Sequence, residues 1–339
     1  MSSTSTPPRP ELSVVVPVFN EEDNIDTLHA RLTAVLNAAG TTYEVVFVND
    51  GSTDRTTSLL DALAEKDPHV VVLTLSRNFG HQAAVTAGID HVRGDAAMVM
   101  DADLQDPPEV IPQFVQMWKA GNDVVYAVRE RRKEGIVLRA CYRGFYRLLN
   151  LISDIDIPLD SGDFGLVDRK VIEAMKALPE RKRFVRGLRS FVGFRQVGLS
   201  YERARRDAGE PKYSWRGLMG LAIDGLVSFS NYPLRIVTYL GLATALMAIV
   251  LTVWVMTDAL IQQSAPQGWA STIVVVLMMS AVQLISLGII GEYIRLMFVE
   301  TKGRPTYIVA REQRAEPEVA PHSPKPATKV RVAVSDSES

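Results

Sequence analysis

Residues 12–130 alternate short apolar runs with amphipathic stretches, and this alternation constrains the fold more strongly than any other feature of the chain. The apolar runs are rich in Val, which is typical of strands buried on both faces of a parallel sheet. We expect strands over 12–18, 43–49, 70–76, 96–100 and 124–128, and helices over 24–39, 56–66, 82–93 and 108–120. The alternation predicts the α/β class, with a mostly parallel sheet and helices on both faces.

Two of these expected strands end in carboxylates. Asp101 and Asp103 follow the run 96–100, and Asp50 follows the run 43–49. Ligands of open α/β sheets bind at the carboxyl edge of the strands. An Asp-x-Asp pair on an extended chain presents both carboxylates on one side. Hard oxygen ligands suit Mg²⁺ or Mn²⁺, which completes its shell with water and phosphates, so the pair predicts a metal that holds a diphosphate.

Several other classes of protein lose support. The sequence after the first strand contains neither G-x-G-x-x-G nor G-x-x-x-x-G-K-[ST], which argues against a dinucleotide oxidoreductase and a P-loop NTPase. The net charge of −2 does not favour nucleic acid as a partner, although basic residues crowd 129–139 and 181–212. The single cysteine, Cys141, excludes an internal disulfide and fits a reducing compartment.

Two long apolar runs predict membrane-spanning helices. Residues 234–256 and 270–290 are almost wholly apolar, and the second run continues to 299. Each is long enough to cross a hydrocarbon core of about 30 Å. The connecting loop 257–269 carries one charge, Asp258, whereas Arg and Lys flank the outer ends of both runs. The positive-inside rule then places the loop outside and both termini in the cytoplasm.

The segment before the first span has a different pattern. Its apolar residues recur at i, i+3, i+4 and i+7, which predicts an amphipathic helix lying in the membrane interface. A helix packed on the soluble domain is the alternative. Small residues within the spans permit close helix packing and hence a homo-oligomer.

Six stretches of sequence carry a family resemblance. In chain order they read SVVVPVFNEEDNI, FVNDGSTD, LSRNFGHQAAVTAGID, DADLQDPPE, IPLDSGDFGLVDR and AGEPKYSWRGL. They resemble glycosyltransferase family 2, which has the GT-A fold. Within it they look like polyprenyl-phosphate glycosyltransferases of the dolichol-phosphate mannosyltransferase type, in their bacterial form with two C-terminal transmembrane helices. The resemblance covers residues 12–304.

The resemblance implies roles for residues at matching positions. Donor nucleotide binding falls to Pro17, Phe19, Glu21, Asp50, Asp101 and Ala102. The metal, Mg²⁺ or Mn²⁺, falls to Asp101, Asp103 and Gln105. The catalytic group is Asp163, Asp103 and Arg129, with Asp163 as the candidate base or as an orienting group. Acceptor phosphate binding falls to Arg206 and Lys212.

Three positions depart from the family's usual residues. Asn49 stands where many members have Asp, Gly165 where Arg is frequent, and Pro211 where Ser or Thr is common. The glycine removes a cation from the acceptor side. His81, with no second His nearby in the sequence, is interpreted as a helix-capping or packing residue.

The resemblance also implies a domain plan. It consists of a disordered N-terminus (1–11), a GT-A domain (12–213), a juxtamembrane amphipathic helix (214–232), a two-helix transmembrane domain (233–299) and a largely disordered cytoplasmic tail (300–339).

The expected activity is inverting transfer of one sugar from a nucleotide sugar to a polyprenyl phosphate, undecaprenyl phosphate, at the cytoplasmic face of the bacterial inner membrane. UDP-glucose is the first candidate donor; GDP-mannose and other UDP-sugars remain open. A processive polysaccharide synthase would carry a Gln-x-x-Arg-Trp motif and more spans, which this chain lacks. A non-catalytic membrane scaffold or glycolipid-translocation partner is the alternative from another class.

Overall fold

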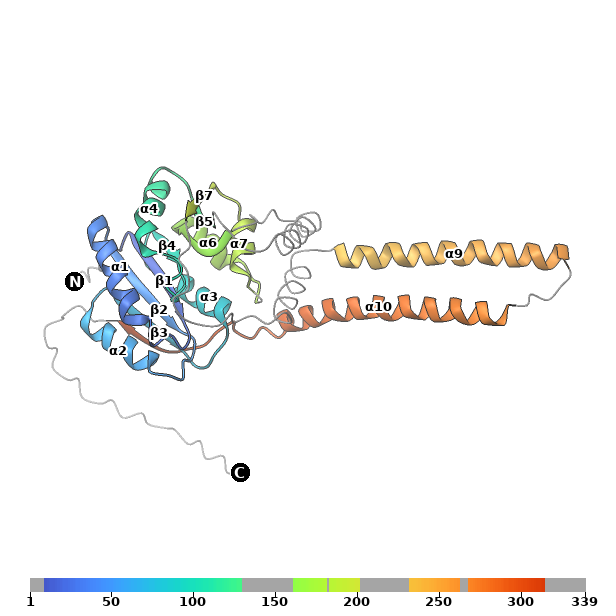
Figure 1. Ribbon diagram of the computed structural model, residues 1–339, viewed down its shortest axis with the longest axis horizontal. Helices are drawn as coiled ribbons and strands as arrows, with labels where there is room; N and C mark the ends of the chain where they lie inside the picture. The colour runs from blue at the N-terminus through green and yellow to red at the C-terminus, as the bar shows by residue number, and fades with distance from the viewer. Residues whose placement is uncertain (1–8, 130–160, 182, 202–231, 263–267, 315–339) are drawn as a thin grey trace, which may run out of the picture.

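The computed structural model describes residues 9–129, 161–181, 183–201, 232–262 and 268–314 (Figure 1). An α/β domain carries a long pair of antiparallel helices. The strands are β1 (Leu12–Val18), β2 (Tyr43–Asn49), β3 (Val70–Leu75), β4 (Ala96–Val99), β5 (Val124–Arg129), β6 (Ser161–Asp168), β7 (Gln196–Tyr201) and β8 (Val309–Arg314). The helices are α1 (Ile25–Ala39), α2 (Thr56–Lys66), α3 (His81–His91), η1 (Pro108–Val110), α4 (Ile111–Lys119), α6 (Arg169–Ala177), α7 (Val185–Phe191), α9 (Tyr232–Gln262) and α10 (Trp269–Thr301).

The eight strands form one mixed sheet in the order β7-β5-β6-β4-β1-β2-β3-β8. The pairs of β1 with β2, β1 with β4, β2 with β3, and β5 with β7 are parallel. Two strands run against this direction: β6 between β4 and β5, and β8 at the outer edge beside β3. The predicted α/β class with a mostly parallel sheet is therefore confirmed.

Helices cover both faces of the sheet, as predicted. Alternate residues of β1 divide between the two apolar layers, because successive side chains on a strand point to opposite faces. Val14 and Val16 pack with Leu28, Leu32 and Phe114 under α1, α2 and α4. Val15 packs on the other face under α3, α6 and α7. All seven residues of β1 and of β2 are buried, so these two strands form the centre of the core.

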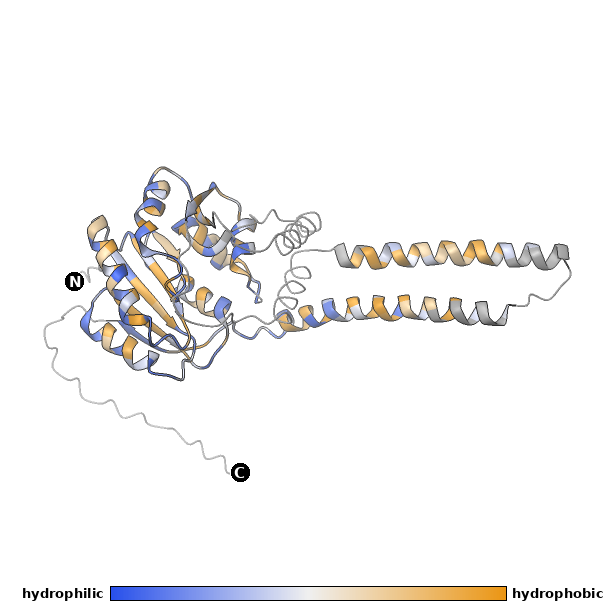
Figure 2. Ribbon diagram, in the orientation of Figure 1, coloured by the Kyte–Doolittle hydropathy of each residue, from blue (hydrophilic) through white to orange (hydrophobic). Residues whose placement is uncertain are grey.

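The two C-terminal helices extend away from the α/β domain, side by side (Figure 1). Figure 2 shows apolar residues along most of their described length, and many large side chains are exposed, such as Trp254 and Leu284. Within α10, the stretch Met278–Thr301 is long and apolar enough to cross a membrane. The comparable described stretch of α9, Ile236–Leu251, is shorter, so a first span remains a prediction.

The structure differs from the expectation for the tail. Residues 309–314 of the predicted disordered segment 300–339 form β8, which pairs antiparallel with β3. The sequence VAREQR does not read as a strand because it carries charges on both sides, but an edge strand tolerates charge and gains its stability from backbone hydrogen bonds to β3. The chain that leaves the α10 helix thus returns to complete the sheet.

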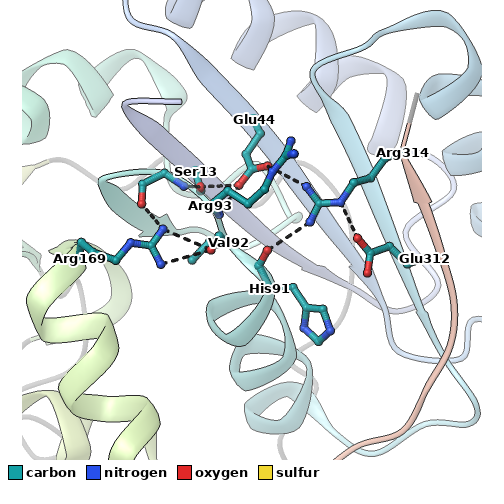
Figure 3. Close-up of polar contacts among 9 residues, drawn as sticks. Ser13, Glu44, His91, Val92, Arg93, Arg169, Glu312 and Arg314 are labelled. Carbon is teal, nitrogen blue, oxygen red and sulfur yellow. Dashed lines mark hydrogen bonds and ion pairs between the residues drawn. The ribbon is translucent and has the colours of Figure 1, made fainter. Parts of the chain in front are cut away.

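A buried carboxylate fastens β8 to the sheet (Figure 3). Glu44, 3% exposed at its side chain, accepts hydrogen bonds from the Ser13 hydroxyl at 2.7 Å and from the Arg93 backbone N–H at 2.7 Å. Its second oxygen lies 3.2 Å from guanidinium nitrogens of both Arg93 and Arg314. Arg314 also donates to the carbonyl of His91. This cluster lies at the amino edge of the strands, opposite the expected ligand edge.

Candidate active site

The antiparallel strand β6 brings Asp163 to the carboxyl edge of β4. Val99, near the end of β4, pairs with Gly165, and residues farther along β4 face residues nearer the start of β6. Continuing this register by two residues sets Asp101 opposite Asp163. Since 62 positions separate the two in the sequence, only the strand reversal makes them neighbours.

Three side chains converge on the Asp163 carboxylate. The imidazole Nε2 of His81 lies 3.3 Å from Oδ2 of Asp163 and 3.8 Å from Oδ1 of Asp101. The guanidinium Nε of Arg186 donates to Oδ1 of Asp163 at 2.7 Å, and the amide of Gln82 donates to Oδ2 at 3.2 Å. The side chain of Asp163 is 6% exposed. The carboxylate is therefore buried, paired and fully engaged.

These contacts shift the pKa values of Asp163 and His81 in opposite directions. Burial alone would raise the pKa of the Asp163 carboxyl, but Arg186 and His81 outweigh it and hold that pKa well below its usual range. Burial opposes the charged form of His81, whereas the carboxylates of Asp163 and Asp101 raise the pKa of its imidazole. An Asp with so low a pKa is a poor base, and its geometry suits it to orient His81 and Arg186.

The candidate metal ligands lie within a cluster of carboxylates. Burial, together with the nearby carboxylates of Asp106, Asp163 and Asp103, raises the pKa of Asp101 to about 6 against the opposing effect of His81. Asp103 accepts a hydrogen bond from the backbone N–H of Gln105 at 3.2 Å. A divalent cation would relieve this repulsion, so the donor set fits Mg²⁺ or Mn²⁺.

The protein supplies only part of a coordination shell. Among the residues that the structure describes, no three or more His, Cys, Asp or Glu side chains are grouped as a metal site. Two carboxylates with further ligands from water and a diphosphate are the arrangement that a hard cation accepts. Ala102, between the two aspartates, is buried at 4% exposure, so its backbone borders the site without a polar side chain.

Asp50 positions the loop that leads to His81. Its oxygens accept hydrogen bonds from the backbone N–H groups of Phe79 at 2.7 Å and Gly80 at 2.9 Å. Burial raises the pKa of the Asp50 carboxyl, and the two N–H donors oppose that rise. Gly51 has φ +69°, and a Cβ there would lie 2.6 Å from the Arg77 carbonyl carbon. The close approach of these two loops therefore requires glycine at position 51.

The other donor-side positions follow β1. Pro17 is buried near the end of β1, whereas Phe19 is 40% exposed just beyond it. Asn20 adopts a left-handed backbone with φ 54°, and its side chain accepts a hydrogen bond from the backbone N–H of Thr53. Glu21 accepts a hydrogen bond from the Asn24 amide at 2.7 Å. The exposed ring of Phe19 thus stands at the same sheet edge as Asp50 and Asp101.

Gly165 makes room for a cation from another element. A Cβ on this glycine would lie 3.2 Å from Nη1 of Arg189, which comes from α7. Arg189 is only 4% exposed, its guanidinium lies 5.6 Å from the centre of the Tyr126 ring, and burial lowers its pKa to about 10. Its Nε and Nη2 atoms have no hydrogen-bond partner within the described part of the chain. A guanidinium therefore occupies the space beside residue 165 despite the glycine.

The remaining predicted site residues are placed only in part. Arg129 is the last residue of β5, at the same edge as Asp101 because β5 and β4 run in the same direction. Arg206 and Lys212 lie outside the described residues, as do Pro211 and residues 214–231 of the expected amphipathic helix.

Sequence reasoning missed the roles of His81, Gln82 and Arg186. The interpretation of His81 as a capping or packing residue is wrong, because its ring lies between two carboxylates. Its position at the start of an expected helix, directly after Gly80, was the available signal. The sequence placed Arg186 only within the basic stretch 181–212, whereas in the structure it pairs with Asp163.

Known proteins resemble this chain over nearly its whole length. Uncharacterized glycosyltransferase YkcC of Bacillus subtilis is 46% identical over 90% of this chain and 95% of its own length. The prophage bactoprenol glucosyl transferase homolog of Escherichia coli is 43% identical over 90% of this chain and all of its own. The bactoprenol glucosyl transferase of Shigella phage SfII is 42% identical over 91% of this chain and all of its own.

Family comparisons divide the chain into the same two parts as the fold. Residues 13–175 match the family described as glycosyl transferase family 2, and residues 232–296 match the GtrB C-terminal hairpin. The chain belongs to glycosyltransferase family 2. The similarity to the bactoprenol glucosyl transferases covers both the family 2 domain and the C-terminal hairpin. A mannosyltransferase structure from Pyrobaculum calidifontis is a distant likeness, 19% identical over 65% of this chain and 63% of its own, with a TM-score of 0.44.

Proposed function

We propose that this protein transfers one sugar from a nucleotide sugar, UDP-glucose in the first instance, to the phosphate of a polyprenyl phosphate and releases the nucleoside diphosphate. The observation that carries the proposal is the convergence of Asp101, His81 and Asp163 at the carboxyl edge of the sheet, beside the inner end of an apolar helix. The relatives named bactoprenol glucosyl transferase support the lipid acceptor and glucose.

The donor diphosphate would bind at the edge formed by Asp50, Asp101 and Asp103. Asp101 and Asp103, with Gln105 beside them, would hold Mg²⁺ or Mn²⁺. When bound, the ion neutralises charge that grows on the leaving diphosphate. Phe19 and Glu21 border the same edge and suit the base and ribose, and Arg129 stands at the end of β5 on the diphosphate side.

The acceptor needs positioning more than deprotonation. A phosphate monoester has a second pKa of about 6 and is already largely anionic at neutral pH. The acceptor phosphate therefore does not need Asp163 as a base. The low pKa of Asp163 agrees with an orienting role for this residue. Arg186, held by Asp163, presents positive charge at the reaction centre, and His81, held by the same carboxylate, adds to it when its ring is protonated. Attack opposite the leaving diphosphate would invert the anomeric configuration of the sugar.

The membrane setting follows from the helical hairpin. We infer that α10 and α9 both cross the bacterial inner membrane, with the α/β domain and both termini in the cytoplasm. The apolar exposure of both helices and the basic residues at the inner end of α10 support this arrangement. The domain plan of catalytic unit, interfacial helix and two spans is part of the same proposal, with β8 added to the catalytic sheet.

A donor panel tests the proposal. Purified full-length protein is supplied with undecaprenyl phosphate, Mn²⁺ or Mg²⁺, and UDP-glucose, UDP-galactose, UDP-N-acetyl sugars or GDP-mannose in turn. We expect a lipid-linked monosaccharide with UDP-glucose, and an anomeric linkage opposite to that of the donor. Failure to form any lipid-linked sugar across the panel would instead favour a non-catalytic scaffold.

A further inference from the structure

An open pocket of about 420 Å³ lies where the inner end of α10 meets the α/β domain. Its walls come from three separate parts of the chain: the start of α3, the loop between α6 and α7, and residues 299–306 at and beyond the end of α10. The side chains that matter here are Gln82, Arg181, Arg183, Val299, Lys302 and Arg304. None of the assigned donor or metal residues lines it.

Backbone contacts tie two of these walls together. The carboxylate of Glu300 accepts hydrogen bonds from the backbone N–H of Arg181 at 3.0 and 3.1 Å. The Thr306 hydroxyl donates to the carbonyl of Arg181 at 3.2 Å. Tyr307 then bonds Asp90 on α3 at 2.9 Å, directly before β8 enters the sheet. The pocket is therefore a fixed feature of the junction between α10 and the catalytic domain.

The pocket is strongly basic. The side chains of Arg181, Lys302 and Arg304 are exposed and have no carboxylate partner within the part of the chain that the structure describes. Arg183 lies 3.8 Å from Asp90, which neutralises part of its charge. Lys302 sits 4.2 Å from the centre of the Phe298 ring, which holds the ammonium near the helix end. At least three positive charges thus remain available to an anion.

One side chain connects the pocket with the reaction centre. Gln82 lines the pocket, and its amide donates to Oδ2 of Asp163 at 3.2 Å. Its carbonyl accepts from the backbone N–H of Val185 at 2.9 Å, so the residue is held in place. Only the side chain of Gln82 would therefore separate an anion in the pocket from the cluster formed by His81, Asp101 and Asp163.

The wall that carries Lys302 and Arg304 also carries an apolar side chain, that of Val299. Val299 belongs to the stretch Met278–Thr301, which is long and apolar enough to cross a membrane. A ligand with an anionic head and a hydrocarbon chain matches this combination of cationic walls and apolar helix. A soluble anion would use only the cationic half.

We propose that this pocket receives the phosphate monoester head of the polyprenyl phosphate acceptor as it leaves the bilayer along α10, before transfer. The inference rests on the proposed function, and adds Arg181, Lys302 and Arg304 to the acceptor side of the site. A monoester carries up to two negative charges, so it gains more from three neighbouring cations than the single charge of a phospholipid diester.

The test is steady-state kinetics of the full-length protein in vesicles. Lys302→Gln/Arg304→Gln removes two charges at similar side-chain size. We expect the KM for undecaprenyl phosphate to rise about tenfold, the size of effect that follows from losing charge-assisted contacts in partly solvated positions. The donor KM and kcat should stay within about twofold, since neither residue touches the donor edge. Lys302→Arg/Arg304→Lys, which keeps both charges, should restore most of the affinity.

Arg9→Gln is the matched control. Arg9 is an exposed arginine near the start of β1, at the sheet edge opposite the ligands, and its loss should leave the acceptor KM unchanged. Binding of UDP with Mn²⁺ by calorimetry, equal in all variants, would establish that the site is intact. An unchanged acceptor KM in the Lys302→Gln/Arg304→Gln variant would overturn the inference.

Two further arms distinguish the source of the phosphate. The defect should be the same in neutral vesicles and in vesicles containing phosphatidylglycerol; a defect seen only with phosphatidylglycerol would show a site for bulk phospholipid and overturn the inference. Competition by millimolar inorganic phosphate that matches the lipid in affinity would also overturn it. If the unmodified protein transfers no sugar to the lipid, the proposed function is wrong, and this inference is wrong with it. If the Lys302→Gln/Arg304→Gln variant transfers sugar with an unchanged KM for undecaprenyl phosphate, only this inference is wrong.

Discussion

His81 Nε2 lies 3.3 Å from Oδ2 of Asp163, and this pair joins the start of α3 to an antiparallel strand that the sequence did not reveal. The contact orders the imidazole against the carboxylates at the sheet edge, and these carboxylates favour its protonated form. His81 follows the loop that Asp50 holds, and its ring also lies near the candidate metal ligand Asp101. The contact therefore connects this loop with both Asp163 and Asp101. The candidate site is therefore built from the ends of β2 and β4, the start of β6, and the starts of α3 and α7.

The His81 imidazole should titrate above its ordinary value of about 6.5 in metal-free protein. The carboxylates favour the protonated ring, so the charged form persists below the raised pKa and is lost as the pH rises through it. Asp163→Asn should lower the His81 pKa, because burial then opposes the charge with less compensation. Histidine ring NMR, assigned with His81→Gln, measures both. Asp123→Asn, which changes a carboxylate paired with Lys170 at the opposite edge of the sheet, should leave the His81 signal unchanged. A His81 pKa unaffected by Asp163→Asn would contradict the assignment.

Metal binding should compete with a proton on Asp101. In the metal-free protein this carboxyl has a pKa of about 6, and the cation binds its deprotonated form. Below that pKa, affinity should fall about tenfold per pH unit. Mn²⁺ titration at about pH 5 and about pH 7 should therefore show about tenfold weaker binding at the lower pH. Equal affinities at the two values would exclude Asp101 as a ligand with this pKa.

Much of the N-terminal half was readable from sequence periodicity. The bounds of β1, β2 and α2 agree with the expected ranges, because these segments combine continuous apolar runs or clear helical spacing with strong turn residues. The expected helix 108–120 divides into η1 and α4, a local change caused by the two prolines at its start.

The rest depended on long-range pairing that local patterns do not contain. β6 reads SGDFGLVD, with two glycines and two acids, and becomes a strand only because β4 and β5 pair with it on both sides. β8 is charged and owes its existence to the exposed edge of β3. The sequence could therefore nominate Asp163 by resemblance, but could not supply its partners Arg186 and His81.

Gly165→Ala should destabilise the catalytic domain by about 1–3 kcal/mol, the usual range for overpacking. The added Cβ would lie 2.9 Å from the backbone carbonyl oxygen of Val125 and 3.2 Å from Arg189 Nη1, and the backbone atom cannot move aside easily. Thermal unfolding in detergent measures the change. Gly241→Ala, where nothing lies within 4 Å of the new Cβ, is the control and should be nearly neutral. An unaltered unfolding temperature for Gly165→Ala would show that the strands relax around it.

Glu44→Gln should loosen the junction between β8 and the sheet. The substitution removes the buried carboxylate that Arg93 and Arg314 share. We expect the free energy of unfolding to fall by about 2–3 kcal/mol. The change is measured as faster protease cleavage within β8 and as a lower temperature of thermal unfolding. Glu109→Gln breaks the exposed pair with Arg31 and should cost less than about 1 kcal/mol. Equal effects of the two substitutions would argue that β8 is held by its backbone hydrogen bonds alone.

The most direct test of the proposed function is transfer of labelled glucose from UDP-glucose to undecaprenyl phosphate by the full-length protein and by the Asp103→Ala variant. We expect a metal-dependent, lipid-linked glucose from the unmodified protein and at least about a hundredfold loss in the variant, since the diphosphate loses a ligand of its counter-ion. Asp123→Asn, which lies away from the ligand edge, should retain full transfer. Undiminished transfer by Asp103→Ala, or no lipid product from the unmodified protein, would contradict the account.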